Sequence, residues 1–279
     1  MMIDKIEKIG SSVIQHGKIN NRIYLMKLNI VDLPQIIPKI DQLAKENNYT
    51  KIFAKIPSKV LPVFTGNNYS IEGFIPRFFD HKTDCFFVSK FLDTERKSVP
   101  VGELISFGDL ILATTRSTRL KYKHSLHYKL ERLSIKEAKT ISDIFKKVFK
   151  TYPFPIHNPD YISETMMEDK TRYFGIKDGK KIIGVSSAEI DIINKNAEMT
   201  DFAVLPEYRG QNLAFRLLIM MELEMKLINI KTVYTIARLK EPGICKTFLK
   251  SGYKYSGTLL NNTNISGNIE SMNLFYKHI

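Results

Sequence analysis

Helix-like and strand-like hydrophobic patterns alternate along the chain. Apolar residues spaced three to four positions apart predict amphipathic helices, most clearly in 33–46, 134–150 and 212–228. Runs rich in β-branched and aromatic residues predict strands, among them 23–28, 50–56, 172–177, 181–193, 197–205, 232–239 and 270–277. The mixture predicts an α+β fold with a mixed central sheet and flanking helices.

Local signals mark where some of these elements begin and end. Asp32 is the predicted N-cap of the first helix. Ser134, followed by Glu137 three residues later, has the spacing of a capping box. The helix that Ser134 opens must end before Tyr152-Pro153-Phe154-Pro155, because two prolines make this segment an irregular loop.

The length of 279 residues suggests two domains, at roughly 150 residues for each. We take the polar, basic stretch 114–129 as the linker and predict a smaller α/β domain over 1–127 and a second domain over 128–279. The segments 64–73 and 248–257 resemble each other, since each runs from a helix-end glycine or asparagine into an aromatic strand. Either the first domain is a degenerate half of the fold of the second, or the likeness arose by chance.

Composition argues against several classes of protein. The hydrophobic content of 43% is ordinary for a globular chain. No apolar run reaches the ~18 residues of a membrane span, and residues 1–10 lack the apolar core of a signal peptide. The two cysteines, Cys85 and Cys245, form no disulfide framework, and neither they nor the six histidines have metal-ligand spacing. We therefore expect a cytoplasmic, reduced protein without a metal.

The net charge of +13 has three interpretations. A basic surface can attract the phosphates of nucleic acids. A solvated lysine surface is the simpler interpretation, because the lysines are scattered rather than grouped in blocks. A basic rim would also help a protein to bind a ligand that carries several phosphates. We expect no nucleic-acid partner.

The segment Val204-Leu205-Pro206-Glu207-Tyr208-Arg209-Gly210-Gln211-Asn212-Leu213-Ala214 joins a predicted strand to a predicted helix. The N–H groups at a helix start lack intrahelical partners and the helix dipole adds positive potential, so a pyrophosphate can bind there. The segment resembles the Arg/Gln-x-x-Gly-x-Gly/Ala signature for acyl-coenzyme A in the GNAT acetyltransferase superfamily. Asn212 stands where that pattern has a glycine, and asparagine tolerates the left-handed conformation better than most residues.

The order of predicted elements over 129–279 also resembles the GNAT fold. The resemblance implies acetyl-CoA as co-substrate, acetyl transfer to an amine, and a strand 197–205 that splays from the strand starting at Thr232. A backbone N–H near Phe202 to Val204 would polarise the thioester carbonyl. The cofactor-binding residues implied are Phe202, Ala203, Val204, Arg209, Gly210, Gln211, Asn212, Leu213, Ala214 and Phe248.

An alkyl ammonium group, with a pKa of about 10.4, must lose a proton before it attacks, and a carboxylate can be the base. Glu198 matches by position the catalytic glutamate of the histone acetyltransferase branch. Asp201 is the rival, and the two point to opposite faces unless a bulge intervenes. Phe248 replaces the tyrosine that protonates the departing thiolate in many relatives. Tyr253 or Tyr255 can replace it, or coenzyme A leaves unassisted, since a thiol pKa is about 8.5.

A closer resemblance is to the β-lysine N-acetyltransferase family. The similar segments are 71–76, the Tyr-Pro-Phe-Pro loop, 187–191, 198–203, 257–273 and 274–277. The family implies acetylation of the ε-amine of β-lysine, giving the compatible solute Nε-acetyl-β-lysine, with lysine 2,3-aminomutase as the companion enzyme. Two alternatives stay open: the same chemistry on a polyamine, amino sugar or protein lysine, and a non-catalytic acetyl-CoA-binding or nucleic-acid-associated protein. The oligomeric state also stays open, a homodimer included.

β-Lysine carries two ammonium groups and one carboxylate. A protein with a net charge of +13 would repel it unless acidic side chains lie around the pocket. Five carboxylates lie on strands around the expected cleft: Glu189, Asp191, Glu198, Asp201 and Glu270. Arg238 or Arg172 can hold the carboxylate of the substrate in a bidentate contact. The remaining expected substrate-binding residues are Tyr152, Phe154, Asn262 and Asn273.

Overall fold

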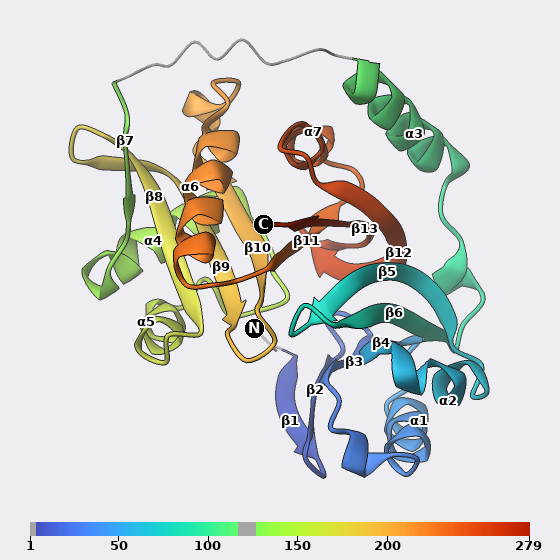
Figure 1. Ribbon diagram of the computed structural model, residues 1–279. Helices are drawn as coiled ribbons and strands as arrows, with labels where there is room; N and C mark the ends of the chain where they lie inside the picture. Colours follow the sequence, from blue (N-terminus) through green and yellow to red (C-terminus); the bar gives the residue numbers. More distant parts are fainter. Residues whose placement is uncertain (1–3, 117–126) are drawn as a thin grey trace.

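The computed structural model describes residues 4–116 and 127–279, and these residues build one curved sheet of thirteen strands (Figure 1). The strand order is β1-β2-β3-β4-β6-β5-β12-β13-β11-β10-β9-β8-β7. The first six strands come from the N-terminal half of the chain and the other seven from the C-terminal half. None of the helices in the described part of the chain has the length and apolar composition of a membrane span.

The N-terminal half contains β1 (Lys5–Ile9), β2 (Ser12–Gly17), β3 (Arg22–Lys27), α1 (Ile36–Glu46), β4 (Lys51–Pro57), α2 (Leu61–Thr65), β5 (Ser70–Phe79) and β6 (Thr83–Phe91). The pattern analysis missed β1 and β2. Asp32 is not the N-cap of α1, which begins at Ile36. Its carboxylate instead accepts hydrogen bonds from the Ser11 backbone N–H and, at 2.6 Å, from the Ser12 hydroxyl. The side chains of α1 and α2 pack on one face of this half-sheet.

Helix α3 (Val101–Arg116) precedes the predicted domain boundary but packs on the C-terminal half. Its Phe107 is buried, with ring centroids 5.1 Å from Tyr255 and 6.1 Å from Phe275. Most of the predicted linker, residues 117–126, lies outside the described residues. The boundary between 127 and 128 therefore stays a prediction.

The C-terminal half contains β7 (Lys129–Arg132), α4 (Ala138–Val148), α5 (Pro159–Met167), β8 (Thr171–Asp178), β9 (Lys181–Asp191), β10 (Asn196–Val204), α6 (Leu213–Leu227), β11 (Thr232–Arg238), α7 (Pro242–Lys250), β12 (Lys254–Ile265) and β13 (Asn268–His278). The capping box of Ser134 and Glu137 is confirmed. Strand β12 continues to Ile265 through a bulge between Leu259 and Thr263.

The two halves repeat one strand order. In the N-terminal half, β1, β2 and β3 are antiparallel, β3 runs parallel to β4, and β4, β6 and β5 follow antiparallel. In the C-terminal half, β8, β9, β10, β11, β13 and β12 have the same order and directions. The similar segments also match in detail, since Phe64–Tyr69 and Phe248–Tyr253 are both T-shaped ring pairs, at 5.1 and 5.0 Å. The N-terminal half thus has the topology of a GNAT half.

The halves join where β5 meets β12, side by side in Figure 1. Gly73 and Gly257 are register partners there, and a Cβ on Gly257 would overlap the carbonyl oxygen of Glu72. Glycine is therefore required for this close approach. A buried cluster shared by both halves lies between them: Tyr24, Phe53, Ile75, Phe78, Phe87, Tyr234, Leu259, Met272 and Leu274.

Candidate active site

Strands β10 and β11 separate part-way along the sheet. They pair only at Asn196↔Thr232, Ala197↔Val233 and Glu198↔Tyr234. Beyond this point β10 bulges between Thr200 and Ala203, with Asp201 in the left-handed region at φ +55°. The predicted splay between the two strands is thereby confirmed.

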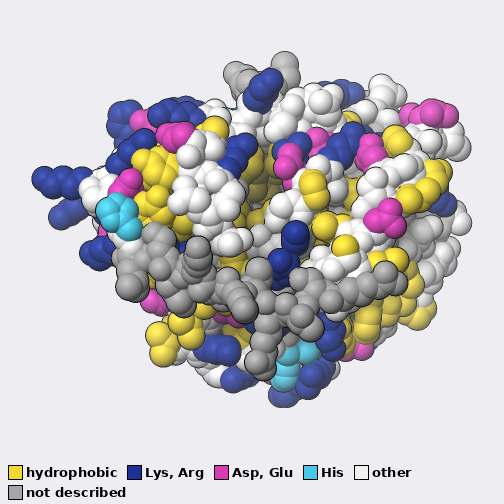
Figure 2. Space-filling view, turned by 90° about the horizontal axis from the view of Figure 1, so that it is seen from above, with side chains coloured by type: hydrophobic (Ala, Val, Ile, Leu, Met, Phe, Trp, Pro, Cys, Tyr) yellow, Lys and Arg dark blue, Asp and Glu magenta, His cyan; other side chains and the backbone are white. Residues whose placement is uncertain are grey.

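A pocket of about 770 Å³ occupies the space between the splayed strands. One end lies against the start of α6 and against α7, the other against the loop that follows α4. Figure 2 looks onto the end of the molecule where α6 begins, and it shows a hollow with hydrophobic side chains inside it. Residues of both strands and both helices line the pocket, among them Phe202, Val204, Gly210, Leu213, Ala214, Ile236, Lys246, Phe248 and Lys250.

The turn before α6 has the backbone that a phosphate site needs. Gly210 has φ +81°, and Asn212, the N-cap of α6, has φ +58°. The expectation that Asn212 replaces glycine in a left-handed conformation is confirmed. The exposed Arg209 side chain bonds back to the Val204 carbonyl at 3.2 Å. Gly210, Asn212 and Leu213 line the pocket, so the start of α6, with its positive dipole potential, borders it.

Some of the other residues expected to bind the cofactor line the pocket and others do not. Gln211 does not line the pocket, and its side-chain oxygen accepts a hydrogen bond from the Tyr128 hydroxyl at 3.1 Å. Ala203 is buried opposite Val185. Lys246 and Lys250 of α7 line the pocket although the sequence analysis did not select them. Their signal is two basic residues one helical turn apart, on the helix that follows the strand starting at Thr232.

The bulge brings the two candidate bases to one side of the sheet. Glu198 is the register partner of Glu189, and the Ser187 hydroxyl donates to the Asp201 carboxylate at 2.5 Å. Since residues 187 and 189 share a face of β9, Asp201 and Glu198 both face the same side. Tyr152 lines the adjacent pocket, and its hydroxyl lies 3.4 Å from Thr200 Oγ1.

These carboxylates hold their protons more tightly than free side chains do. Burial raises the pKa of Asp201, although hydrogen bonds from Ser187 and Tyr152 lower it. Burial likewise raises the pKa of Glu198, with partial compensation by Lys55 and Tyr234. Partial removal of its carboxyl group from water and repulsion from Glu198 raise the pKa of Glu189, although the residue as a whole is exposed at the edge of the cluster. A raised pKa places a carboxylate closer to the range of a useful general base.

Comparison with known proteins agrees with this geometry. The model of the acetyltransferase (GNAT) family matches residues 138–253. A β-lysine N(6)-acetyltransferase from Methanococcus maripaludis is 40% identical over 279 residues, which cover 99% of each chain. The chain belongs to the GNAT acetyltransferase family. It is an N-acetyltransferase, and enzymes of this family use acetyl-CoA.

Two further relatives of this acetyltransferase are similar over different lengths. The N-acetyltransferase YodP of Bacillus subtilis is 30% identical, with 100% of both chains covered. A β-lysine N(6)-acetyltransferase of Methanosarcina mazei is 34% identical over 139 residues, which are 50% of this chain and 51% of that protein.

Several residues that were expected to bind the substrate of the acetyltransferase are bound to other protein groups. Arg238 lines the pocket, but it forms a bidentate pair with Glu270, at 2.9 and 2.7 Å. Asp191 accepts two hydrogen bonds from Asn194 in the β9–β10 turn. The Asn273 amide oxygen accepts a hydrogen bond from Thr258 at 2.8 Å.

Three more expected contacts also lie away from the pocket. Phe154 packs in the core beneath α4 and α5, and Arg172 pairs with Asp169 at 3.3 Å. Asn262 belongs to a segment that holds the two halves together, since its backbone carbonyl accepts from Arg22. The neighbouring Asn261 bonds to the backbone carbonyls of Arg96 and Ser98. The segment 257–273, which resembles the β-lysine N-acetyltransferase family, thus contributes to the joint between the halves.

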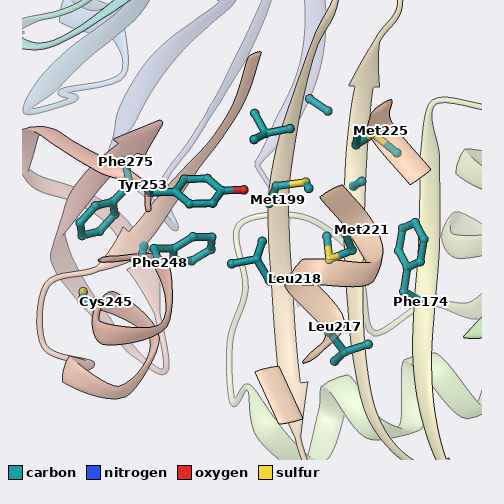
Figure 3. Close-up of a cluster of buried hydrophobic side chains, with 14 of the residues drawn as sticks. Phe174, Met199, Leu217, Leu218, Met221, Met225, Cys245, Phe248, Tyr253 and Phe275 are labelled. Atoms are coloured by element: carbon teal, nitrogen blue, oxygen red, sulfur yellow. The ribbon is translucent and has the colours of Figure 1, made fainter. Parts of the chain in front are cut away.

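Tyr253 does not line the pocket. It is buried in the core beside Phe248 and Phe275 (Figure 3). Burial and the nearby Glu222 raise its pKa well above the usual value. Phe248 does line the pocket, with its ring perpendicular to that of Phe202 at 5.5 Å. The role predicted for Tyr253 therefore has no support from this placement.

Proposed function

We propose that this acetyltransferase transfers the acetyl group of acetyl-CoA to the ε-amine of β-lysine. One observation carries the proposal: a pocket with a phosphate-binding turn at one end has Asp201 on its wall, and Glu198 and Glu189 lie next along the same face. Carboxylates recognise ammonium groups, and β-lysine has two. The full-length similarity to a β-lysine N(6)-acetyltransferase supports this choice among amines.

In the proposed reaction, the turn at 209–213 binds the pyrophosphate of acetyl-CoA and the acetyl chain enters between β10 and β11. Backbone N–H groups of the bulge, at 202–204, polarise the thioester carbonyl. Glu198 accepts a proton from the ammonium group, directly or through water, and the free amine attacks the carbonyl carbon. Asp201, held by Ser187, orients the amine. Coenzyme A leaves as the thiolate, which a thiol pKa of about 8.5 permits, and the second proton of the attacking nitrogen passes to that thiolate or to water as the amide forms.

The product implies a biological setting, which we also propose. An aminomutase that converts lysine to β-lysine, lysine 2,3-aminomutase, would supply the substrate in the cytoplasm. The product has lost one positive charge and is a zwitterion, which suits a compatible solute because it can accumulate without changing the net charge of the cell.

The test is release of coenzyme A thiol by the purified protein with acetyl-CoA and four acceptors: β-lysine, α-lysine, spermidine and a lysine peptide. We expect the highest kcat/KM with β-lysine, and mass spectrometry of the product should place the acetyl group on the ε-nitrogen. Preference for spermidine or the peptide would overturn the substrate while the chemistry stands. No release with any acceptor would overturn the proposed function.

A further inference from the structure

Next to the pocket, residues from the two halves of the chain meet. Thr200 and Ile236 line the pocket, and Glu198 and Tyr234 lie two residues earlier on the same faces of β10 and β11. Lys55, from β4 of the N-terminal half, reaches this group, and its Nζ donates to the Tyr234 hydroxyl at 3.2 Å. The N-terminal half thus places a cation next to the carboxylates that are proposed to receive the amine.

The ammonium group of Lys55 has spare hydrogen-bonding capacity. It carries three donors, and within the described residues the Tyr234 hydroxyl is its one hydrogen-bond acceptor. No described carboxylate lies within 4.0 Å of its Nζ, whereas Lys51 on the same strand face is paired with Glu72 at 2.8 Å. The rings of Phe78 and Tyr234, both at 5.5 Å, hold the group in place. Lys55 is half-buried, so part of its side chain is accessible to solvent.

Lys55 is charged at neutral pH. Burial lowers its pKa, but Tyr24, Glu198 and Asp191 together raise it above the usual value. A fixed cation among carboxylates is unfavourable for a polyamine, which presents ammonium groups alone. The same cation is favourable for an amino acid whose carboxylate lies at the end opposite the reacting amine.

We propose that Lys55 binds the carboxylate of the acceptor and makes the enzyme select amino-acid diamines over polyamines. The proposal rests on the proposed function and assigns one end of its substrate. The N-terminal half thereby supplies specificity, while the C-terminal half supplies acetyl-CoA binding and the base. No signal in the local sequence around Lys55 indicates this role, because it depends on how the two halves pack.

The test compares β-lysine with β-lysine amide, which keeps both ammonium groups and replaces the carboxylate by a neutral carboxamide. Wild-type protein should use β-lysine with a kcat/KM about 10- to 100-fold higher than the amide, the range of a hydrogen bond to a charged group. Lys55→Met should lower kcat/KM for β-lysine about 10- to 100-fold more than for the amide, because any change at the neighbouring Glu198 affects both compounds and only β-lysine has the carboxylate. The matched control is Lys59→Met, which removes an exposed lysine four residues away and should change neither value.

An equal loss with both compounds in Lys55→Met would overturn this assignment and make Lys55 a structural or positioning residue. Unchanged acetyl-CoA affinity and an unchanged circular dichroism spectrum establish that the variant is folded. Wild-type protein that prefers the amide would also overturn the assignment, but not acetyl transfer itself. Wild-type protein inactive toward both compounds would overturn the proposed function and this assignment together.

Discussion

The two halves of the chain share a strand order but differ in the turn that follows the parallel crossover strand. Residues 28–35 in the N-terminal half and 205–212 in the C-terminal half have equal length and lead into α1 and α6. The second turn has Gly210 and Asn212 in the left-handed region, and its helix start is open to the pocket. The first turn has no glycine and carries Asp32, whose negative charge would repel a phosphate. We therefore propose that acetyl-CoA binds at the second turn and not at the first.

A second difference lies on the sheet face between the halves. In each parallel strand pair the third register pair from the start can be compared: it is Tyr24↔Phe53 in β3–β4 and Glu198↔Tyr234 in β10–β11. The N-terminal half thus has aromatic groups where the C-terminal half has the proposed base. Its contribution at this face is a hydrophobic wall and, at Lys55, a cation. The topology is retained while the chemistry is divided between the halves.

Replacement of the proposed base should have the largest effect. Glu198→Gln should lower kcat by about 10²- to 10⁴-fold, the usual contribution of a general base, because the amide cannot accept the proton. Acetyl-CoA binding should persist, as measured by titration calorimetry. The control Glu46→Gln, on an exposed position of α1, should keep full activity. Full activity of Glu198→Gln at neutral pH would exclude Glu198 as the base and leave Asp201.

The pH profile of the wild-type enzyme gives a second test of the base. The pKa of Glu198 is raised, so activity should fall as the pH is lowered through a value above the usual carboxylate pKa of about 4.3. The residual activity of Glu198→Gln should lack this acidic limb. An identical limb in wild type and variant would assign the titration to another group.

Loss of the buried ion pair between Lys51 and Glu72, at the joint of the two halves, should have the next largest effect, which is on the stability of the protein. Lys51 is fully buried, pairs with Glu72 at 2.8 Å and donates to the Leu260 carbonyl at 2.7 Å across the joint. Lys51→Met leaves the Glu72 charge buried and unpaired, which should lower the free energy of unfolding by about 3–5 kcal/mol in urea titrations. The double variant Lys51→Met/Glu72→Gln should recover part of the loss. A double variant less stable than Lys51→Met would contradict the ion-pair explanation.

Sequence pattern predicts elements and local turns well here, because their causes are local. The capping box at Ser134 and the left-handed Asn212 follow from neighbouring residues alone. The bulge at Asp201 and the pairing of Arg238 with Glu270 could not be predicted, since both depend on the register between strands. Lys55 depends further on the packing of the two halves. The family resemblance predicted the reaction, but it did not indicate which carboxylates are free to meet a substrate.

Removal of a basic side chain near each turn should weaken acetyl-CoA binding moderately at the turn 205–212 and not at the turn 28–35. Arg209→Ala removes an exposed cation beside the turn and should weaken acetyl-CoA binding about 3- to 10-fold, with loss increasing at low salt. The matched change in the N-terminal half, Lys39→Ala at an exposed position of α1, should leave the Kd unchanged. Equal weakening by both variants would point to a general effect of net charge rather than to this turn.

The smallest expected effect is a gain in stability. Glu189 has a raised pKa in the folded protein, so the folded state favours its protonated form, and stability is lost as the pH rises through that pKa. Because the residue is exposed, solvent screens most of this cost, and Glu189→Gln should raise Tm at pH 7 by about one degree. The difference should vanish below the usual carboxylate pKa of about 4.3. A lower Tm of the variant at pH 7 would show that Glu189 is stabilised by contacts in its ionised form.

The most direct test of the division between the halves is the stoichiometry of acetyl-CoA binding to the wild-type protein, measured by titration calorimetry. One acetyl-CoA per chain is the predicted result, with the site lost in Gly210→Val, where a β-branched residue is strained at φ +81°. Two equivalents per chain, or one that survives Gly210→Val, would contradict the assignment of acetyl-CoA binding to the C-terminal half alone.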